Sequence, residues 1–293
     1  MNSKEIKWAY LIVLSIIWGS SFILIKKGLI GLTAMQLGSL RILFAAVFLL
    51  MIGFKSLAKI PKNKWKYIAL TSVLGTFFPA YLFAIAETEI DSSITAILNA
   101  MTPLNTLILG AIFFGIHFQK RQLWGVFIGL IGSILLVLNG AINNPGQNYY
   151  YAILVIMATI CYAINVNLIK RFLSDLSPLS ISTGNFAVLI LPTFSILLFS
   201  GFFKVVSQES VQHSVLFIMI LGVIGTGIAN VLFFKLIQMS SPVFATSVTY
   251  LIPIVAFFWG LLDNEMLSSL QFLGALIILL GVYLSAKKTA KAA

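Results

Sequence analysis

Long apolar stretches alternate with short polar links along the whole chain. Crossing the hydrocarbon core of a bilayer as a helix takes about 20 predominantly apolar residues. Ten segments have roughly that length: 8–25, 33–54, 67–86, 92–116, 122–140, 149–169, 177–203, 214–234, 241–262 and 266–286. Because the links between them are short and many carry Lys, Asn, Pro or Gly, this pattern predicts an all-α integral membrane protein with ten transmembrane helices.

The composition supports a membrane protein and argues against a metal centre. Sixty per cent of the 293 residues are hydrophobic and 9% are charged, whereas a soluble domain carries about 25% charged residues. The single cysteine, Cys161, lies within an apolar run and has no partner for an internal disulfide. His117 and His213 stand at segment ends, apart from one another. We therefore expect neither a metal site nor another cofactor.

The excess of basic residues indicates the orientation of the chain. A net charge of +11 on a soluble protein would suggest nucleic acid, but basic residues of membrane proteins concentrate in cytoplasmic loops. With the N-terminus in the cytoplasm, Arg41 lies within a span, Lys26, Lys27 and Lys204 fall outside the cell, and the other fifteen of the nineteen basic residues fall inside. This asymmetry predicts a multi-pass protein of the cell membrane with both termini cytoplasmic, and no nucleic-acid partner.

The second half of the chain repeats the pattern of the first. "WGSSFILIKK", beginning at Trp18, aligns with "YAINVNLIKR" at Tyr162 with an offset of 144. "LGTFFPAYLF" aligns with "IGTGIANVLF", and Pro103 with Pro253, with an offset of 150. The ordered matches predict two five-helix repeats, residues 7–140 and 149–286. Since five is odd, the second repeat should cross the membrane in the opposite direction.

Inverted repeats are typical of secondary transporters, which bind their substrate near the bilayer midplane between the repeats. A proline inside a helix removes a hydrogen bond to the carbonyl four residues earlier. Pro103 and Pro253 therefore predict symmetry-related helix breaks that free the carbonyls of Asn99 and Thr249. We expect these breaks to border the central cavity.

Polar and aromatic side chains at helical spacing supply candidate substrate contacts. Ser15, Trp18 and Ser21 share one helix face, as do Thr159, Tyr162 and Asn165 at equivalent positions. Close helix packing is the alternative explanation of both stripes. The full set of candidate substrate-binding residues is Trp18, Ser21, Arg41, Tyr81, Asn99, Tyr162, Asn165, Asn230, Thr249 and Tyr250.

Arg41 is expected to face the interior of the bundle, to pair with backbone carbonyls or to extend its charged end toward the membrane surface, because a charge within the membrane costs about 2.5–3.5 kcal/mol on insertion scales. The sequence leaves two roles open for it, namely a pairing that holds the bundle together and a direct contact with substrate. Its equivalent in the second repeat is Asn185, which is also polar.

Two stretches and one residue resemble the EamA-type branch of the drug/metabolite transporter superfamily. They are "WGSSF" in the first span, Arg41 in the second, and "SSPVFATSVTYLIPIVAFFWGLLDNEMLSSLQFLGALIILLGVYL" near the C-terminus. Asn264–Glu265 matches a "GE" pair that the family typically carries after span nine, whereas the first repeat has Gly115 at the corresponding place. The resemblance implies ten helices in two repeats and the movement of small metabolites, often outward, including amino acids, sugars and cofactor precursors.

Together these features predict a secondary transporter, with export as the expected direction, for a small metabolite such as an amino acid. It would work by alternating access around a central cavity, with the small-molecule substrate and the lipid bilayer as its partners. The alternatives are a membrane assembly or regulatory protein that transports nothing, and an intramembrane enzyme. An enzyme is disfavoured because acids and histidines are missing from the span centres. Substrate identity, coupling ion and oligomeric state stay open.

Overall fold

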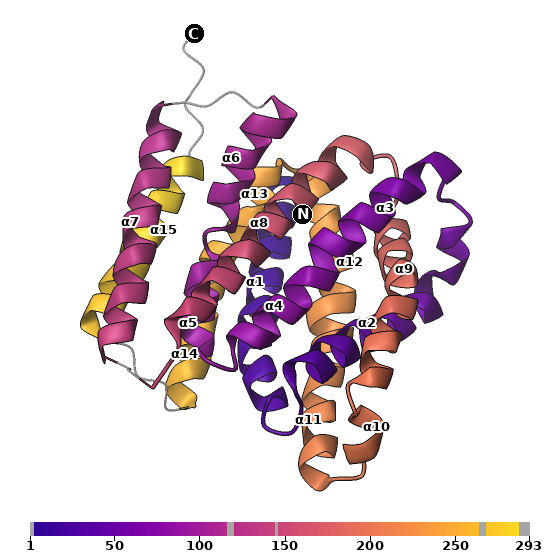
Figure 1. Cartoon of the computed structure of the whole chain (residues 1–293). Coiled ribbons are helices and arrows are strands. Elements are labelled where there is room, and N and C mark those ends of the chain that lie inside the picture. Colours follow the sequence, from indigo (N-terminus) through magenta and orange to yellow (C-terminus); the bar gives the residue numbers. More distant parts are fainter. Residues whose placement is uncertain (1–2, 116–119, 144–145, 264–267, 287–293) are drawn as a thin grey trace.

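The apolar segments form helices that pack side by side into one bundle (Figure 1). The computed structural model describes residues 3–115, 120–143, 146–263 and 268–286. Within these residues the regular structure is helical, with turns and bends between the helices. The Asn264–Glu265 pair of the family resemblance lies outside the described residues.

Several predicted segments consist of more than one helical piece. The helices of the first half are α1 (Ser3–Gly28), α2 (Ala34–Leu57), η1 (Lys62–Lys64), α3 (Trp65–Ser72), η2 (Val73–Phe77), α4 (Phe78–Ala86), α5 (Ser92–Asn99), α6 (Thr102–Phe114) and α7 (Lys120–Asn143). Those of the second half are η3 (Tyr149–Tyr151), α8 (Ala152–Phe172), α9 (Pro178–Phe199), α10 (Phe202–Val205), α11 (Glu209–Ile220), η4 (Leu221–Ile228), α12 (Ala229–Met239), α13 (Pro242–Thr246), η5 (Ser247–Tyr250), α14 (Ile252–Leu262) and α15 (Ser269–Ala286).

Eight helical stretches among the described residues are long and apolar enough to cross a membrane. They are Glu5–Gly28, Ala34–Leu57, Lys62–Ala86, Ser92–Phe114, Tyr149–Phe172, Pro178–Phe199, Glu209–Met239 and Pro242–Leu262. The two other predicted segments, 122–140 and 266–286, overlap α7 and α15 where the structure describes them. The protein is therefore an all-helical, multi-pass membrane protein with at least eight helices of spanning length.

The outer surface of the bundle carries many large apolar side chains. Leu191, Phe199 and Met51 are 78%, 86% and 80% exposed. Such large apolar side chains would be costly in water, and they suit contact with lipid chains. The interior instead buries a set of polar side chains, which include Ser15, Arg41, Asn99 and Asn165. Buried polar groups inside an apolar shell are what a solute pathway through a membrane requires.

Both prolines singled out in the sequence follow a break in a helix. α5 ends at Asn99 and α6 begins at Thr102, so that Pro103 lies in the first turn of α6. Pro253 likewise lies in the first turn of α14, directly after η5. Proline is well tolerated there because the first amides of a helix have no partner within the helix.

A second pair of irregularities occurs at equivalent positions in the two halves. η2 and η4 are π-helical stretches with five residues or more, each continuous with the α-helices on both sides. They contain the glycines Gly75 and Gly225, which the offset of 150 aligns. A π-helical turn widens the helix locally and often occurs at functional sites.

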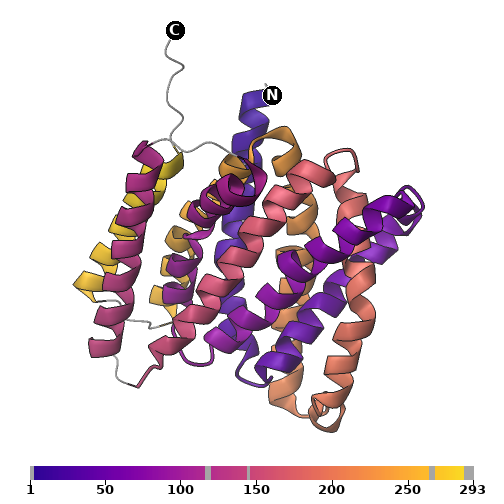
Figure 2. The same cartoon turned by 45° about the horizontal axis from the view of Figure 1, so that its top comes forward.

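The helices α7 and α15 lie side by side at one edge of the bundle (Figures 1 and 2). Their contact depends on glycine, since a Cβ atom on Gly132 would lie 2.7 Å from the amide nitrogen of Ile278. A Cβ atom on Gly281 would lie 2.6 Å from the carbonyl oxygen of Gly125. The two backbones thus approach as closely as small residues permit.

Candidate functional site

A cavity of about 80 Å³ lies between helices of the two halves of the chain. One water molecule needs roughly 10–15 Å³ of such cavity volume, so the cavity has room for several groups of the size of a water molecule. Eight of the ten candidate residues from the sequence line it: Trp18, Ser21, Arg41, Asn99, Tyr162, Asn165, Asn230 and Thr249. The structure thus brings together residues that are up to 231 positions apart in the sequence.

Two candidate residues are not part of the cavity lining. The hydroxyl groups of Tyr81 and Ser39 are 2.9 Å apart and share a hydrogen bond, and the Tyr81 ring packs edge-on against Phe77. Tyr250 packs against the largest apolar core cluster instead of the cavity. Each follows a lining residue, Ala80 or Thr249, and consecutive residues point about 100° apart on an α-helix and about 120° apart on the 3₁₀-helix η5.

Glycines in the two π-helical stretches accommodate polar side chains from helices opposite. A Cβ atom on Gly75 would lie 2.6 Å from Cγ of Asn165 in α8. A Cβ atom on Gly225 would lie 2.9 Å from Oγ of Ser21 in α1. Since Ser21 and Asn165 are equivalent at offset 144, the same contact between the two halves of the chain occurs twice, with the roles of the halves exchanged.

The aromatic rings of the two stripes occupy different surroundings. The indole nitrogen of Trp18 donates to the carbonyl oxygen of Gly225 at 3.0 Å, and its ring packs edge-on against Phe233. The ring of Tyr162 stacks on Phe83, with the centroids 6.0 Å apart. These rings give the cavity an apolar wall, while the Trp18 hydrogen bond fixes the indole to the π-helical stretch η4.

Arg41 places a positive charge beside the cavity. Its side chain is 9% exposed, and Nε donates to Oγ1 of Thr226 at 2.8 Å. Thr226 lies in η4, and its own hydroxyl donates to the carbonyl oxygen of Leu221, five residues earlier. The equivalent of Arg41, Asn185, is absent from the cavity lining and its side-chain amide lies 3.0 Å from the Thr71 hydroxyl.

The helix breaks contribute hydroxyl groups that sequence reasoning did not select. The carbonyl oxygen of Asn99, which Pro103 frees, accepts a hydrogen bond from the Thr102 hydroxyl at 2.7 Å. The Thr249 hydroxyl donates to the carbonyl oxygen of Thr246 at 2.9 Å. Thr102 and Thr246 both line the cavity, as do Thr76 and Thr226. Thr102, Thr76 and Thr226 each stand directly beside a proline or glycine of the irregular stretches, and this adjacency was their signal in the sequence. Thr246 has no such neighbour.

Ion pairs join the two halves of the chain at opposite ends of the bundle. Lys26 and Lys27 end α1 and both bind Asp263, which follows α14; the Lys26–Asp263 distance is 2.7 Å. Their hydrogen bonds hold the pKa of the Asp263 carboxyl below its usual range. α2 runs back across the bundle from the end where Lys26 and Lys27 lie, and Lys64 follows it in η1. Lys64 therefore lies at the opposite end of the bundle from Asp263.

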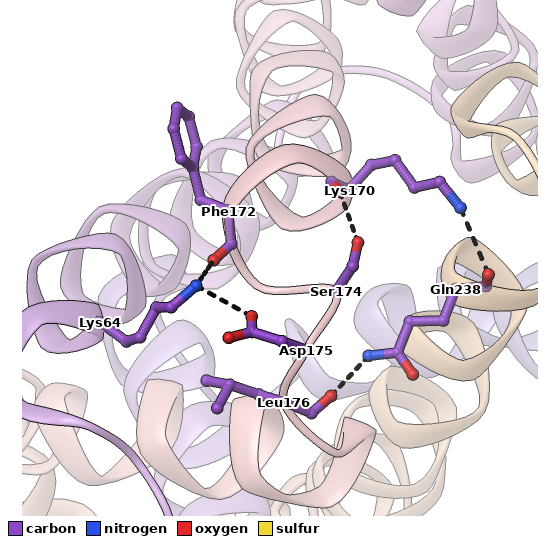
Figure 3. A network of polar contacts seen from close by, with 7 residues as sticks. All are labelled: Lys64, Lys170, Phe172, Ser174, Asp175, Leu176 and Gln238. Carbon is purple, nitrogen blue, oxygen red and sulfur yellow. Dashed lines mark hydrogen bonds and ion pairs between the residues drawn. The ribbon is translucent and has the colours of Figure 1, made fainter.

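The contacts around Lys64 form a network with the link between α8 and α9 (Figure 3). Lys64 Nζ lies 2.9 Å from the Asp175 carboxylate and donates to the Phe172 carbonyl oxygen at 2.7 Å. The hydrogen bond from Lys64 holds the pKa of the Asp175 carboxyl below its usual range. Lys170 donates to the carbonyl oxygen of Ser240 at 2.7 Å, at the C-terminal end of α12.

Comparisons with known proteins place the chain among membrane transporters. The model of the "EamA-like transporter family" matches residues 6–138 and 150–287. A "probable amino-acid metabolite efflux pump" of Escherichia coli K12 is 25% identical over 97% of this chain and 95% of the relative. The "uncharacterized inner membrane transporter YedA" of the same strain is 29% identical over 94% of this chain and 88% of the relative.

A solved crystal structure shares the fold. It superposes with a TM-score of 0.67 at 14% sequence identity, and the match covers 97% of this chain and 96% of that one. The family match, which spans both halves of the chain, confirms the resemblance found in the sequence. Family members and named relatives are transporters, not enzymes. The chain therefore belongs to the EamA-like transporter family and is a membrane transporter.

Proposed function

We propose that this protein exports a small metabolite, with amino acids as the first candidates, by alternating access around the cavity. The printed name of the Escherichia coli relative, an amino-acid metabolite efflux pump, supports both the class of substrate and the direction. The observation that carries the proposal is the cavity itself, because residues from equivalent positions of the two halves line it together.

The proposed substrate site consists of the eight candidate residues that line the cavity. Its aromatic wall would contact an apolar part of the solute, and its hydroxyl and amide groups would bind a polar part. Tyr81 and Tyr250 are left out of the proposed site, since neither lines the cavity. Pro103 and Pro253 would allow α5–α6 and η5–α14 to bend as access alternates.

The proposed topology has ten spans, with α7 and α15 as the fifth and tenth. The two five-helix repeats, 7–140 and 149–286, would then have opposite orientations and both termini would lie in the cytoplasm. Support comes from the basic residues, which fall mainly on one side in this arrangement. The contacts Gly75–Asn165 and Gly225–Ser21 support it too, because inverted repeats that face one another should form the same contact twice.

Transport is tested with the purified full chain in proteoliposomes. We expect the protein to accelerate the exchange of at least one labelled amino acid over empty liposomes, and Asn99→Ala or Thr249→Ala to weaken its apparent affinity with protein abundance preserved. Exchange of no amino acid by the folded protein would contradict the proposed substrate class. Unchanged affinity in both variants would place the substrate site elsewhere.

Topology is tested in a Cys161→Ser background, which removes the single native cysteine. Lys62→Cys lies at the exposed start of η1, before α3, and Gly146→Cys lies at an exposed position in the link before η3. An impermeant thiol reagent applied to intact cells should label the cysteine at position 146 and spare the one at position 62. Labelling of both positions from outside would contradict the ten-span arrangement.

A further inference from the structure

Among the described residues that line the cavity, Arg41 is the one whose side chain is charged at pH 7. The rest of the lining consists of amide, hydroxyl, aromatic, aliphatic and glycine residues. A solute in this cavity therefore experiences one fixed positive charge and no opposite charge from the lining. In the low dielectric of the membrane interior, such a charge interacts more strongly than it would in water.

The guanidinium group of Arg41 is only partly used by the protein. Nε donates to Thr226, and no other side-chain hydrogen bond or ion pair of Arg41 occurs within the described residues. The terminal Nη groups carry the remaining four N–H donors of the guanidinium. Because the Thr226 contact holds one side of the planar group, it positions the remaining donors without occupying them.

The acid that interacts electrostatically with Arg41 does not occupy its donors. Glu87 lies at the end of α4, is 9% exposed and is not part of the cavity lining. It offsets part of the positive charge at long range. Since no ion pair of Arg41 occurs among the residues that the structure describes, the in-plane edge of the guanidinium formed by its Nη groups stays available to a solute.

A guanidinium with paired donors matches the two oxygens of a carboxylate. An amine brought into the same cavity would meet a like charge, and an amide would lack the charge that strengthens the hydrogen bonds. We propose that Arg41 binds the carboxylate of the transported solute, so that the protein selects carboxylates over the matching amides and amines. This assignment rests on the proposed function, because it names the substrate group that the cavity receives.

Selection is measured with matched solutes on the purified full chain. One set is L-leucine, L-leucinamide and 3-methylbutylamine; a second is L-phenylalanine, L-phenylalaninamide and 2-phenylethylamine. An alkyl phosphate of similar size tests whether another anion serves better. The readouts are stabilisation of the protein against heat as a function of solute concentration, and exchange of the same solutes in proteoliposomes.

The wild-type protein should respond to at least one of the two acids at about tenfold lower concentration than to its amide, and should not respond to the amine. Arg41→Gln should weaken the response to the acid about tenfold or more and remove the preference over the amide. Arg41→Lys, which keeps the charge without the planar donors, should be intermediate. Lys55→Gln removes an exposed charge from the same helix and should change nothing.

The assignment is overturned if the wild-type protein responds equally to acid and amide, responds to neither acid, or prefers the phosphate. It is also overturned if both Arg41 variants keep the wild-type preference. Should Arg41→Gln fail to fold, the preference of the wild type and its change in Arg41→Lys decide the matter. Carboxylate-specific stabilisation without exchange would refute transport and leave the binding assignment of Arg41 standing. Exchange of the amine or amide alone would refute the binding assignment and leave transport standing.

Discussion

Glycine serves two different purposes in this protein, one beside the cavity and one between α7 and α15. Beside the cavity, Gly75 and Gly225 face the side chains of Asn165 and Ser21. Between α7 and α15, Gly132 faces the backbone of Ile278 and Gly274. A side chain can move aside when a methyl group is added, but the backbone of a helix cannot do so without moving the helix. The comparison suggests a rigid edge and an adaptable centre, which suits a protein that must rearrange around a solute.

The largest effect is expected from Gly132→Ala. The added Cβ would lie 2.7 Å from the amide nitrogen of Ile278 and 2.8 Å from the carbonyl oxygen of Gly274, so that α7 and α15 must separate. Overpacking of this kind costs about 1–3 kcal/mol, and we expect the upper part of that range. Thermal unfolding of the purified protein measures it. Gly146→Ala is the control, because a Cβ there meets open space; equal stability of the two variants would contradict a rigid edge.

A smaller loss of stability is expected from Gly75→Ala, together with weaker substrate binding. Its Cβ would lie 2.6 Å from Cγ and 2.8 Å from Oδ1 of Asn165, which must shift within the cavity wall. We expect a cost of about 1–2 kcal/mol and a raised apparent KM in the exchange assay. Adding Asn165→Ser imitates the Ser21 contact of the other half and should restore the stability. Failure of the second substitution to restore it would show that the glycine is required for another reason.

Gly225→Ala should be milder still. Its Cβ would lie 2.9 Å from Oγ of Ser21 and 3.0 Å from Cδ1 of Leu221, and both are the ends of side chains that can rotate. We expect a stability loss of at most about 1 kcal/mol, measured by the same unfolding assay. A loss as large as that of Gly132→Ala would erase the distinction between edge and centre.

How much of this arrangement the sequence predicts depends on the kind of feature. Helices of spanning length follow from hydropathy, because the bilayer demands about 20 apolar residues whatever the packing. Four cavity residues followed from the two polar-aromatic stripes, which contain Trp18 and Ser21 in α1 and Tyr162 and Asn165 in α8. The repeat in the sequence marked them, because both halves of the chain keep polar groups at equivalent positions. The ten-span count and the termini stay predictions.

Which helices face one another could not be predicted from a single sequence. The alignment of Gly75 with Gly225 marked the two glycines as equivalent without showing that Asn165 and Ser21 lie against them. The π-helical stretches have no recognisable signature in the sequence, and they alter the direction of the side chains that follow. This limit explains why the sequence selected Tyr81, which follows a lining residue. In the structure Tyr81 binds Ser39 and does not line the cavity.

The ion pairs at the two ends of the bundle should differ modestly in their contribution to stability. Asp263 is 17% exposed and has two lysine partners, whereas Asp175 is 58% exposed and has one. Because solvent screens exposed pairs, each contributes at most about 1 kcal/mol. Asp263→Asn should therefore destabilise the protein more than Asp175→Asn at pH 7.

The effect of Asp263 should depend on pH in a defined direction. Its pKa is lowered in the folded protein, so its stabilising contribution is present above the unfolded value of about 3.9 and is lost as the pH falls through the lower folded value. Unfolding of wild type and Asp263→Asn between pH 7 and pH 3 measures this. The difference between them should be constant down to about pH 4 and shrink below it; a difference that grows on acidification would contradict the ion pair.

The central claim is that the solute passes through the cavity between the two halves, and chemical blocking of that cavity tests it most directly. In a Cys161→Ser background, Thr249→Cys places a thiol at a lining position that is 6% exposed. Treatment with a small, water-soluble methanethiosulfonate reagent should abolish amino-acid exchange in proteoliposomes, and excess substrate should slow the modification. The same treatment of Lys62→Cys, exposed and outside the cavity lining, should leave exchange intact. Undiminished exchange after complete modification of the cysteine at position 249, verified by intact mass, would show that the solute does not use this cavity.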